Sequence, residues 1–409
     1  MRSVKKWLNR AGTSLVVFVI ALMSMRFLAA SAAELPTPCQ YLAQVVHRQS
    51  SEPLFLASYP TVQSGPLQGA AFLYDNAVAT IALIACGNVK EAAHIGDAIL
   101  IALAHDRYWH DGRLRNGYLA GPVRDRPVKL SGWWDPKQNR WVEDRYQVGS
   151  DNGNMAWAIL ALLALDRTTG DHRYRDGAVR LGVWTIQWRD KSKPGGFTGG
   201  TFAHEPVPVT EHWKSTEHNT DMAAAFTGLA QTTGDAKWLA QAQAAQSFVR
   251  AMWLPQCSCF AAGTKEDGKT RNVYLALDAQ TWPLLAIPGA AQRYRSALAL
   301  EKLRQDAGFA YSEAKEGLWT EGTAQVALLQ ELSGHEAKAT QLMKTVEAMR
   351  TPDGSYYASS TKELPTGFML ETDPTQPRQY FHVAHLAAAS WAAIAQRRYN
   401  PFTGASTLP

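Results

Sequence analysis

The chain has 409 residues, of which 46% are hydrophobic, 19% charged and 10% aromatic, and its formal net charge is +5. This composition can bury a large core, and one closed domain can occupy the whole length because no linker interrupts it. Four of its basic residues lie within the first ten positions, so the remainder has no basic stripe that would indicate nucleic-acid binding.

The N-terminus reads as a targeting segment. A basic start is followed by an uncharged, largely apolar run over residues 11–25 and then by the small residues 29–33. This order predicts a signal peptide over residues 1–33, export to the periplasm or the medium, and a mature domain over 34–409. The alternative is an uncleaved anchor, but fifteen residues fall short of the roughly twenty that a membrane-spanning helix needs.

Beyond this segment, six Ala-rich apolar stretches each begin with polar or ionisable residues. These openings lie at 74–77, 150–154, 216–221, 277–280, 319–323 and 381–385. After the second and third stretches comes the same phrase, Thr-Thr-Gly-Asp, in which the Gly can end one helix and the Asp can cap the next. The recurrence predicts a repeated helical hairpin with an inner and an outer helix.

The number of helices predicts how the chain closes. Five complete hairpins begin near residues 75, 152, 218, 279 and 321, whereas the sixth inner helix, from about His382 to Gln396, has no outer partner after it. Residues Pro38 to Gln49 have apolar residues at helical spacing and precede the first inner helix, so we expect them to supply that partner. Twelve helices in two concentric rings result.

This organisation, with the phrases Thr-Glu-His-Asn-Thr-Asp at 216–221 and Trp-Thr-Glu-Gly-Thr-Ala-Gln at 319–325, resembles the six-hairpin glycosidase superfamily. The resemblance covers roughly residues 38–402. It implies an all-α (α/α)6 toroid and a carbohydrate-active protein whose cleft lies where the inner helices begin. It assigns no particular hydrolase family.

Carboxylates recur at the openings: Asp75, Asp151, Glu217, Asp278 and Glu321. Any one of them has an ordinary role as a helix cap, but Ser or Thr would cap equally well, so five on one rim indicate function. Glycoside hydrolysis needs one protonated carboxyl and one ionised carboxylate. We therefore expect the catalytic residues to be Glu217, Asp75, Asp278, Glu321 and Asp221.

Among these, Glu217 is the preferred acid, because Asp221 lies one helical turn away and burial beside it would raise the pKa of Glu217. Asp75, Asp278 and Glu321 are the candidates for the base. The resemblance implies an inverting reaction, for which the two carboxyls stand roughly 6.5–9.5 Å apart.

Other polar and aromatic residues of the openings are candidates for holding sugar hydroxyls and rings, although each also has a packing role as its alternative. They are Tyr74, Asn76, Asp151, Asn152, His218, Asn219, Gln280, Trp319 and His382. The three-residue spacing of His382 and His385 suits a shared metal ion, but no third ligand is evident, so binding of substrate hydroxyls or capping of neighbours is the preferred role. We expect neither a metal site nor a cofactor.

The four cysteines are Cys39, Cys86, Cys257 and Cys259, and export would bring them into an oxidising compartment where disulfides form. Three connectivities are possible. Cys39 and Cys86 both belong to the seam where the ring closes, which makes them the preferred long-range bridge. Cys257 and Cys259 lack the second ligand pair of a zinc site.

Three classes of function fit these features. The first is an exported glycoside hydrolase that acts on a polysaccharide or oligosaccharide, with exopolysaccharide machinery as a candidate partner. The second is a lyase or sugar epimerase on the same toroid, using His218, His382 or Arg271. The third is a glycan-binding protein without catalysis.

Overall fold

The structure is a computed structural model that describes residues 34–203, 205, 207–294, 297–370 and 373–406. The predicted signal peptide at 1–33 lies outside the described residues, and its cleavage stays a prediction. From Pro36 onward the chain forms one structural unit. Among the described residues, no helix has both the length and the apolar character needed to cross a membrane.

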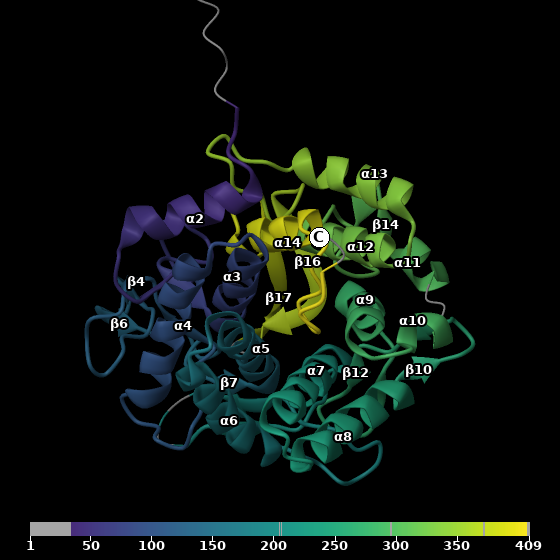
Figure 1. Ribbon diagram of the computed structural model, residues 1–409, viewed down its shortest axis with the longest axis horizontal. Coiled ribbons are helices and arrows are strands. Elements are labelled where there is room, and N and C mark those ends of the chain that lie inside the picture. The colour runs from purple at the N-terminus through teal and green to yellow at the C-terminus, as the bar shows by residue number, and fades with distance from the viewer. Residues whose placement is uncertain (1–33, 204, 206, 295–296, 371–372, 407–409) are drawn as a thin grey trace, which may run out of the picture. The chain divides into compact units, whose positions relative to one another are not determined.

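Six helices form the inner ring and follow one another around it in chain order (Figure 1). They are α3 (Leu73–Ala85), α5 (Asn152–Thr169), α7 (Thr216–Thr233), α9 (Leu277–Ala286), α12 (Thr320–Leu332) and α14 (Leu386–Gln396). Each contacts the next, and α14 also contacts α3, which closes the ring. They are buried on nearly all sides, which explains their Ala-rich composition, because small side chains let helices approach closely.

The outer ring surrounds them with more amphipathic helices (Figure 1). These are α2 (Pro38–Gln49), α4 (Val89–Ala104), α6 (His172–Ile186), α8 (Lys237–Ala251), α10 (Ala290–Arg293) with α11 (Ala297–Leu303), and α13 (Glu336–Glu347). The predicted closing helix is confirmed, since α2 contacts α14 and α3. The predicted (α/α)6 toroid is therefore confirmed.

Two parts of the ring differ from the prediction. The fourth outer position holds two short helices, α10 and α11, after an inner helix that contains Pro283 and ends early at Ala286. The last inner helix begins at Leu386 rather than His382, because a strand occupies the chain up to Phe381 and His385 takes the N-cap position. His382 therefore lies in the connection and not on the helix.

The Thr-Thr-Gly-Asp phrases act as the sequence predicted. Gly170 and Gly234 end α5 and α7 with φ of 72° and 70°, values in the left-handed region that favours glycine. Asp171 then accepts a hydrogen bond of 3.0 Å from the backbone N–H two residues on, and Asp235 accepts an equivalent one of 2.9 Å. Each phrase thus ends an inner helix and starts its outer partner.

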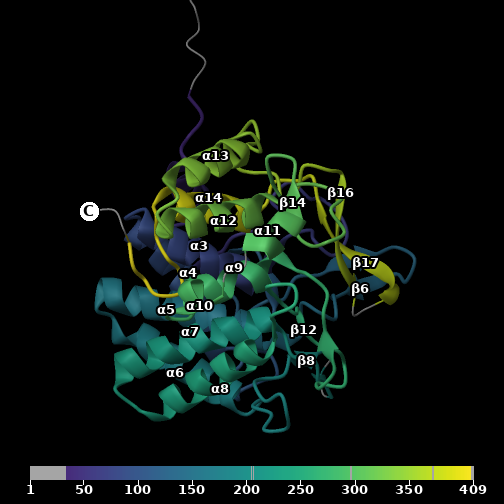
Figure 2. The ribbon, with the colours of Figure 1, turned by 90° about the vertical axis from the view of Figure 1, so that its right-hand side faces the viewer.

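Antiparallel strands lie in the loops that lead from outer to inner helices; β7, β8 and β9 form a three-stranded sheet, and the others form two-stranded sheets. Their bounds are β1 (Leu54–Phe55), β2 (Ala70–Phe72), β3 (Gly117–Leu119), β4 (Gly121–Pro122), β5 (Trp133–Asp135), β6 (Arg140–Val142), β7 (Ser150–Asp151), β8 (Gly200–Phe202), β9 (Val209–Glu211), β10 (Trp253–Leu254), β11 (Cys259–Phe260), β12 (Gly263–Thr264), β13 (Arg271–Asn272), β14 (Arg304–Gln305), β15 (Gly308–Phe309), β16 (Glu363–Leu370) and β17 (Asp373–Phe381). Figure 2 shows β6, β8, β12, β16 and β17 together at one end of the ring. The inner helices begin at this end, so the loops build walls around their N-termini.

The preferred Cys39–Cys86 bridge forms, and of the three open connectivities the structure has the one in which the other two cysteines also pair. Cys39 on α2 is bonded to Cys86, the residue that caps α3, so the bridge fastens the closing helix to the first inner helix. Cys257 is bonded to Cys259 within one loop. The seam of the ring is therefore covalently closed as well as packed.

Candidate active site

A cavity of about 520 Å³ opens where the inner helices begin. Its walls come from the loops at 59–67 and 144–147 and from the β16–β17 hairpin, and its base comes from the first turns of the inner helices. The volume lies within the range of about 300–1,000 Å³ that is typical of small-molecule sites.

The structure brings all five predicted catalytic carboxyls to this cavity: Asp75, Glu217, Asp221, Asp278 and Glu321. Three of the predicted substrate-binding residues, Tyr74, Asp151 and His218, also line it. Their convergence follows from the fold, because the N-termini of the inner helices all face the same end of the ring. The catalytic roles themselves stay predictions.

Glu217 is the half-buried member of a cluster of three carboxyls. Burial raises its pKa to about 7, and the positive charge of Arg378 limits the rise. Asp221 and Asp278 are almost fully buried, and burial followed by the charge of Glu217 raises the pKa of each well above its ordinary range. Among the described residues the carboxyl of Glu217 has no hydrogen-bond partner, so it is open to a ligand.

Two hydrogen bonds in series position the carboxyl of Glu321. The Tyr74 hydroxyl donates to its Oε1, and Nε1 of Trp391 donates to the Tyr74 oxygen over 2.9 Å. Burial raises the pKa of Glu321 to about 7, which His385 and the Tyr74 hydrogen bond partly oppose. The pKa of Tyr74 is well above its ordinary value because of burial and the nearby Glu321, so the hydroxyl stays a donor.

His385, which the sequence suggested for substrate hydroxyls, capping or a metal ion, lies between two of the carboxyls. Its Nε2 is 3.4 Å from Oδ2 of Asp75, and its Nδ1 is 3.9 Å from Oε2 of Glu321. Burial alone would lower the pKa of His385, but Asp75 and then Glu321 outweigh it and raise the pKa. The ring stacks on Tyr59 with centroids 4.6 Å apart, which fixes its plane.

His218 also lines the cavity, but its pKa moves in the opposite direction to that of His385. Burial, followed by the charge of Arg378, lowers its pKa to about 4, so the imidazole is neutral at physiological pH. It packs beside Trp213, with ring centroids 5.4 Å apart. Gly153 on α5 makes room for it, because a Cβ there would lie 2.4 Å from Cδ2 of the imidazole.

Asp151 is fixed by an amide from a neighbouring loop. Nδ2 of Asn116 donates to Oδ1 of Asp151 over 2.7 Å, and Oδ1 of Asn116 accepts from the Asp151 backbone N–H over 2.7 Å. The Asn116 oxygen also accepts from Nδ2 of Asn154, another cavity residue. Two polar groups of the cavity are thus positioned through one amide.

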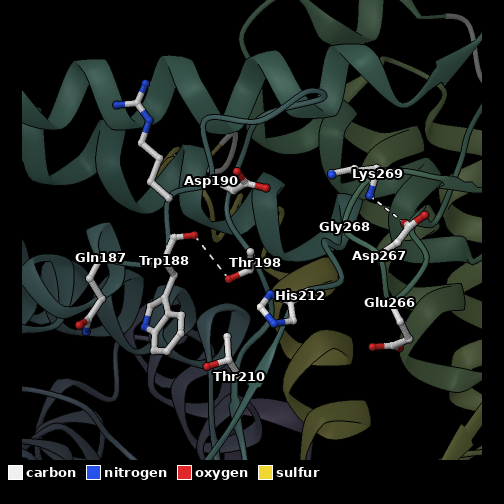
Figure 3. A pocket seen from close by; sticks show the side chains of 11 residues that line it. Gln187, Trp188, Asp190, Thr198, Thr210, His212, Glu266, Asp267, Gly268 and Lys269 are labelled. Atoms are coloured by element: carbon white, nitrogen blue, oxygen red, sulfur yellow. Dashed lines mark hydrogen bonds between the residues drawn. The ribbon is translucent and has the colours of Figure 1, made fainter.

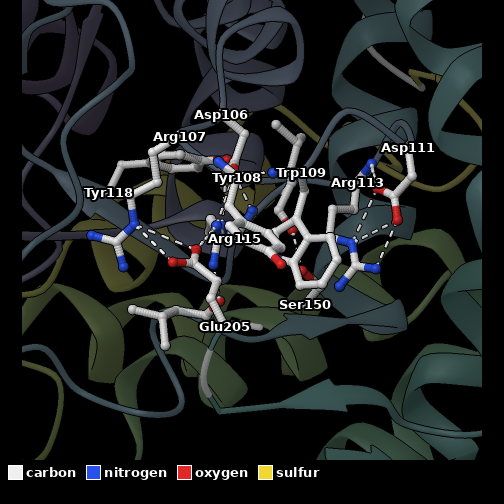
Figure 4. Close-up of polar contacts among 12 residues, drawn as sticks. Asp106, Arg107, Tyr108, Trp109, Asp111, Arg113, Arg115, Tyr118, Ser150 and Glu205 are labelled. Carbon is white, nitrogen blue, oxygen red and sulfur yellow. Dashed lines mark hydrogen bonds and ion pairs between the residues drawn. The ribbon is translucent and has the colours of Figure 1, made fainter. Parts of the chain in front are cut away.

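The loop that carries Asn116 rests on a buried ion-pair cluster of Asp106, Arg115 and Glu205 (Figure 4). Nε of Arg115 lies 2.6 Å from Oδ2 of Asp106, and both side chains are at most 3% exposed. Burial would raise the pKa of Asp106, but the hydrogen bonds and charge of Arg115 outweigh it and lower the pKa. Arg115 also donates to the Val148 carbonyl over 2.9 Å, which ties this loop to the approach to α5.

Four predicted substrate-binding amides do not line the cavity. Three of them hold both backbone groups of one loop residue, with bond lengths of 2.8–3.0 Å: Asn76 holds Leu56, Asn219 holds Phe197 and Gln280 holds Phe260. Nδ2 of the fourth, Asn152, donates to the Thr198 carbonyl over 2.8 Å. Buried loop backbone needs such partners, so these amides fasten the loops to the inner helices.

Two further substrate-binding predictions also fall outside the cavity lining. Trp319 caps α12 and is only 1% exposed, with its ring packed on Tyr311. His382 stacks on Tyr357, and its Nδ1 lies 2.6 Å from the Ser359 carbonyl oxygen. His382 and His385 therefore have different partners, and no group of His, Cys, Asp and Glu suited to a metal ion occurs among the described residues.

Sequence reasoning missed most of the aromatic lining and the charged residue above it. These lining residues include Tyr59, Tyr146, Trp157, Tyr311, Arg378 and Tyr380. A signal did exist for the indoles: Trp157, Trp282 and Trp391 each stand five residues after the first residue of an inner helix. Their rings pack together with centroids 5.3–6.2 Å apart beneath the carboxyls. The β16–β17 hairpin, which supplies Arg378, had no comparable signal.

Comparison with known proteins supports the fold and goes no further. No protein-family model matches the chain, and no curated protein matches it by sequence. A solved glycosidase is 14% identical, with a TM-score of 0.60 over 88% of this chain and 95% of its own. A family 76 glycoside hydrolase from a bovine Bacteroides thetaiotaomicron strain is 11% identical, with a TM-score of 0.57 over 87% of this chain and 76% of its own.

A third similar structure carries a different activity in its name. Cellobiose 2-epimerase from Bacillus thermoamylovorans B4167 is 12% identical, with a TM-score of 0.55 over 87% of this chain and 95% of its own. At these identities the likeness establishes the shared helical toroid. The chemistry has to be argued from the residues of the cavity.

Proposed function

We propose that the protein is a glycoside hydrolase that takes sugar units of an oligosaccharide or polysaccharide into the cavity. The observation that carries the proposal is Glu217, a cavity-facing carboxyl whose pKa is raised to about 7 by burial and which has no hydrogen-bond partner among the described residues. Support also comes from the fold, since similar structures include glycosidases, one of them a variant in complex with glucose.

In this mechanism Glu217 is the general acid. Its raised pKa keeps a large share of the carboxyl protonated near neutral pH, and the proton passes to the glycosidic oxygen as the bond to the leaving sugar breaks. The charge of Asp278 raises the pKa of Asp221, and burial raises the pKa of both. A raised pKa in each neighbour reduces the negative charge beside Glu217.

Among the remaining carboxyls, Asp75 is the best candidate for the base. The pKa values of Asp221 and Asp278 are raised well above the ordinary range. The pKa of Glu321 is raised to about 7, and its carboxyl already accepts a hydrogen bond from the Tyr74 hydroxyl. Asp75 keeps its Oδ2 without a hydrogen bond among the described residues, 3.4 Å from the His385 imidazole. We assign it the activation of water on the face of the sugar opposite Glu217, which inverts the anomeric carbon and requires a carboxyl separation of roughly 6.5–9.5 Å.

The test is a soluble glycan panel followed by product analysis. Hydrolysis predicts new reducing ends from at least one glycan, and proton NMR of the first product should show inversion. Glu217→Gln should lose activity but regain the bond-breaking step on substrates with a good leaving group, which need no proton. Asp75→Asn should not be rescued in this way. Full activity of Glu217→Gln, measured beside an active parent, would reject the assignment.

An epimerase is the second candidate, favoured by the two histidines that line the cavity. His218 is a neutral imidazole that can accept a proton, and His385 is poised beside Asp75. The other residues considered for this class, His382 and Arg271, do not line the cavity. Incubation with cellobiose separates the two activities, because an epimerase returns a disaccharide of unchanged mass and a hydrolase returns monosaccharides.

Export remains part of the proposal. Two disulfides account for all four cysteines, and structural disulfides persist in oxidising compartments. Together with the N-terminal segment they support a periplasmic or secreted location. Cell fractionation with mass spectrometry of the mature N-terminus tests it, and an intact N-terminus in a membrane fraction would favour the anchor. An association with exopolysaccharide machinery stays a prediction, and co-purification from the producing cell would test it.

A further inference from the structure

A second concave site lies beside the cavity, in the loops between α6 and α9. It is a groove of about 550 Å³ lined by residues 187–190, by Thr198, Thr210 and His212, and by residues 266–269 (Figure 3). None of these residues belongs to the cavity described above. The groove therefore needs an account of its own.

The segment that follows β9 contributes to both the groove and the cavity. β9 ends at Glu211, and of the two residues that follow it His212 lines the groove whereas Trp213 lines the cavity. Trp213 packs beside His218 at the base of that cavity. A chain molecule bound in the cavity therefore needs to pass only this segment to reach the groove.

The chemistry of the groove suits a neutral ligand that is rich in hydroxyl groups. Acids and bases alternate along it: Asp190 pairs with the buried Lys214, whose Nζ is 2.6 Å from its Oδ2, Lys269 follows Glu266 and Asp267 in the chain, and Arg189 donates to Gln241. A site for an anion or a metal ion would carry an excess of one sign.

Hydrogen-bonding groups nevertheless remain available in the groove. The side chains of Gln187, His212 and Glu266 have no hydrogen-bond partner among the described residues. The half-buried indole of Trp188, which packs against Trp184 with centroids 5.4 Å apart, adds an aromatic surface. Aromatic faces next to unpaired polar groups are what sugar rings use for binding, since a ring presents both C–H and O–H groups.

We propose that the groove is a distal subsite that binds further sugar units of the same glycan chain whose reacting unit lies in the cavity. This inference rests on the proposed function and adds to it that the natural substrate is a chain longer than a disaccharide. Binding in the groove holds the polymer, while the chemistry takes place at the carboxyls.

The test compares a groove variant with a matched control. The groove variant is His212→Ala with Glu266→Gln, and the control is His335→Ala with Glu336→Gln at the N-terminal end of α13. All four side chains are exposed, so neither pair should disturb folding, which circular dichroism and thermal unfolding verify. Each protein is run through native gels that contain a soluble β-glucan, a mannan, a xylan or a polygalacturonate, and is assayed on a chain-length series of any glycan that the parent cleaves.

The groove variant should bind the polysaccharide that retards the parent about tenfold more weakly. Its kcat/KM on long chains should also fall about tenfold. A tenfold change corresponds to the loss of roughly one good hydrogen bond. Its kcat/KM on the disaccharide should match the parent, and the control should match the parent throughout. Equal retardation of parent and groove variant, retardation of no protein in any gel, or an equal loss on the disaccharide would each overturn the groove proposal. Retardation that depends on the groove in a parent that cleaves nothing would instead reject the proposed function and leave the groove standing.

Discussion

Two regions of this molecule bury ionisable groups, and they do so in opposite ways. Beside the cavity, the Arg115 guanidinium and the Asp106 carboxyl are almost fully buried, but they neutralise one another and make hydrogen bonds to backbone as well. Inside the cavity, Glu217 raises the pKa of both Asp221 and Asp278, and buried oxygens of these two aspartates have no hydrogen-bond partner among the described residues.

The first region, the ion-pair cluster of Asp106, Arg115 and Glu205, acts as a structural frame, whereas the second, the group of cavity acids, is the reactive site. A buried pair of opposite charges costs desolvation but satisfies itself, so it serves to fix the loop that carries Asn116. A cluster of buried acids raises the pKa of its members, and a raised pKa is what a carboxyl needs if it is to donate a proton near neutral pH. The pKa directions show this contrast, since Asp106 moves down and the cavity acids move up.

The largest expected effect comes from breaking the frame. Arg115→Met should lower the free energy of unfolding by about 3–5 kcal/mol, because it leaves Asp106 buried without its cation. Urea denaturation measures the change. The control is Arg124→Met, which breaks an exposed pair with Glu52 and should leave stability unchanged. A loss below about 1 kcal/mol in Arg115→Met would mean that the cluster does not hold the loop.

The next effect falls on activity and spares the fold. Glu217→Gln keeps the shape of the side chain but removes its proton, so kcat should fall at least a hundredfold, in line with general-acid catalysis of about 10²–10⁴. Steady-state kinetics on a substrate with a poor leaving group measure it. Asp106→Asn serves as the comparison, since it should reduce stability while the folded fraction keeps its kcat. Similar kcat losses in both variants would erase the distinction between frame and site.

The two regions should also respond oppositely to pH. Glu217 holds its proton to about pH 7 in the folded protein but releases it near 4.5 when unfolded, so the folded state binds more protons between these values. The free energy of unfolding therefore falls as pH rises through this window, by up to about 3 kcal/mol from this group. Glu217→Gln lacks this ionisation, so its free energy of unfolding should not fall in this way. The difference in stability between the variant and the parent should therefore shift in favour of the variant from pH 5 to pH 8.

Asp106 gives the opposite sign. Because its pKa is lowered, its stabilisation is complete above its ordinary value of 3.8 and is lost as pH falls below that value. Denaturation of parent, Glu217→Gln and Asp106→Asn at several pH values resolves both signs. If the stability difference between Glu217→Gln and the parent were the same at pH 5 and pH 8, the buried carboxyl cluster would not titrate as described.

The fold was predictable because it rests on local patterns that repeat. Apolar runs of helical length, Gly170 and Gly234 as stops, and Asp171 and Asp235 as caps are all readable within a few residues. The same counting identified the closing helix at Pro38–Gln49 and its bond through Cys39. The division of the fourth outer position into α10 and α11 was missed, because no glycine or proline lies between residues 290 and 303 to mark a helix stop.

The site was predictable where position along an inner helix decides it, and not where tertiary contacts decide it. The carboxyls were found because helix N-termini must face the cavity. Asn76, Asn219 and Gln280 occupy similar positions but turn to loop backbone that lies 20 or 22 residues away in sequence. Whether an amide meets a sugar or a peptide group depends on where the loop passes, which one sequence does not reveal. Arg378 was missed for the same reason.

The smallest expected effect tests the connection between the cavity acids and the core beneath them. Tyr74→Phe removes the hydroxyl that donates to Glu321 and accepts from Trp391, so the indole N–H loses its partner. The free energy of unfolding should fall by about 1–2 kcal/mol, and kcat should fall less than tenfold. Because the lost hydrogen bond favours ionised Glu321, the pKa of Glu321 should rise from about 7, and the part of the pH–activity profile that depends on it should move to higher pH.

Tyr174→Phe is the matched control, since it also removes a tyrosine that donates to a carboxylate, over 3.1 Å to Asp97 in the outer ring. The pH dependence of kcat/KM for the three proteins separates a positioning role from a packing role. A merely structural Tyr74 would lower stability and leave the profile in place, as Tyr174→Phe should. A displaced profile in Tyr74→Phe alone would show that the ionisation of Glu321 is set through this hydroxyl, and that the aromatic core under the carboxyls takes part in tuning them.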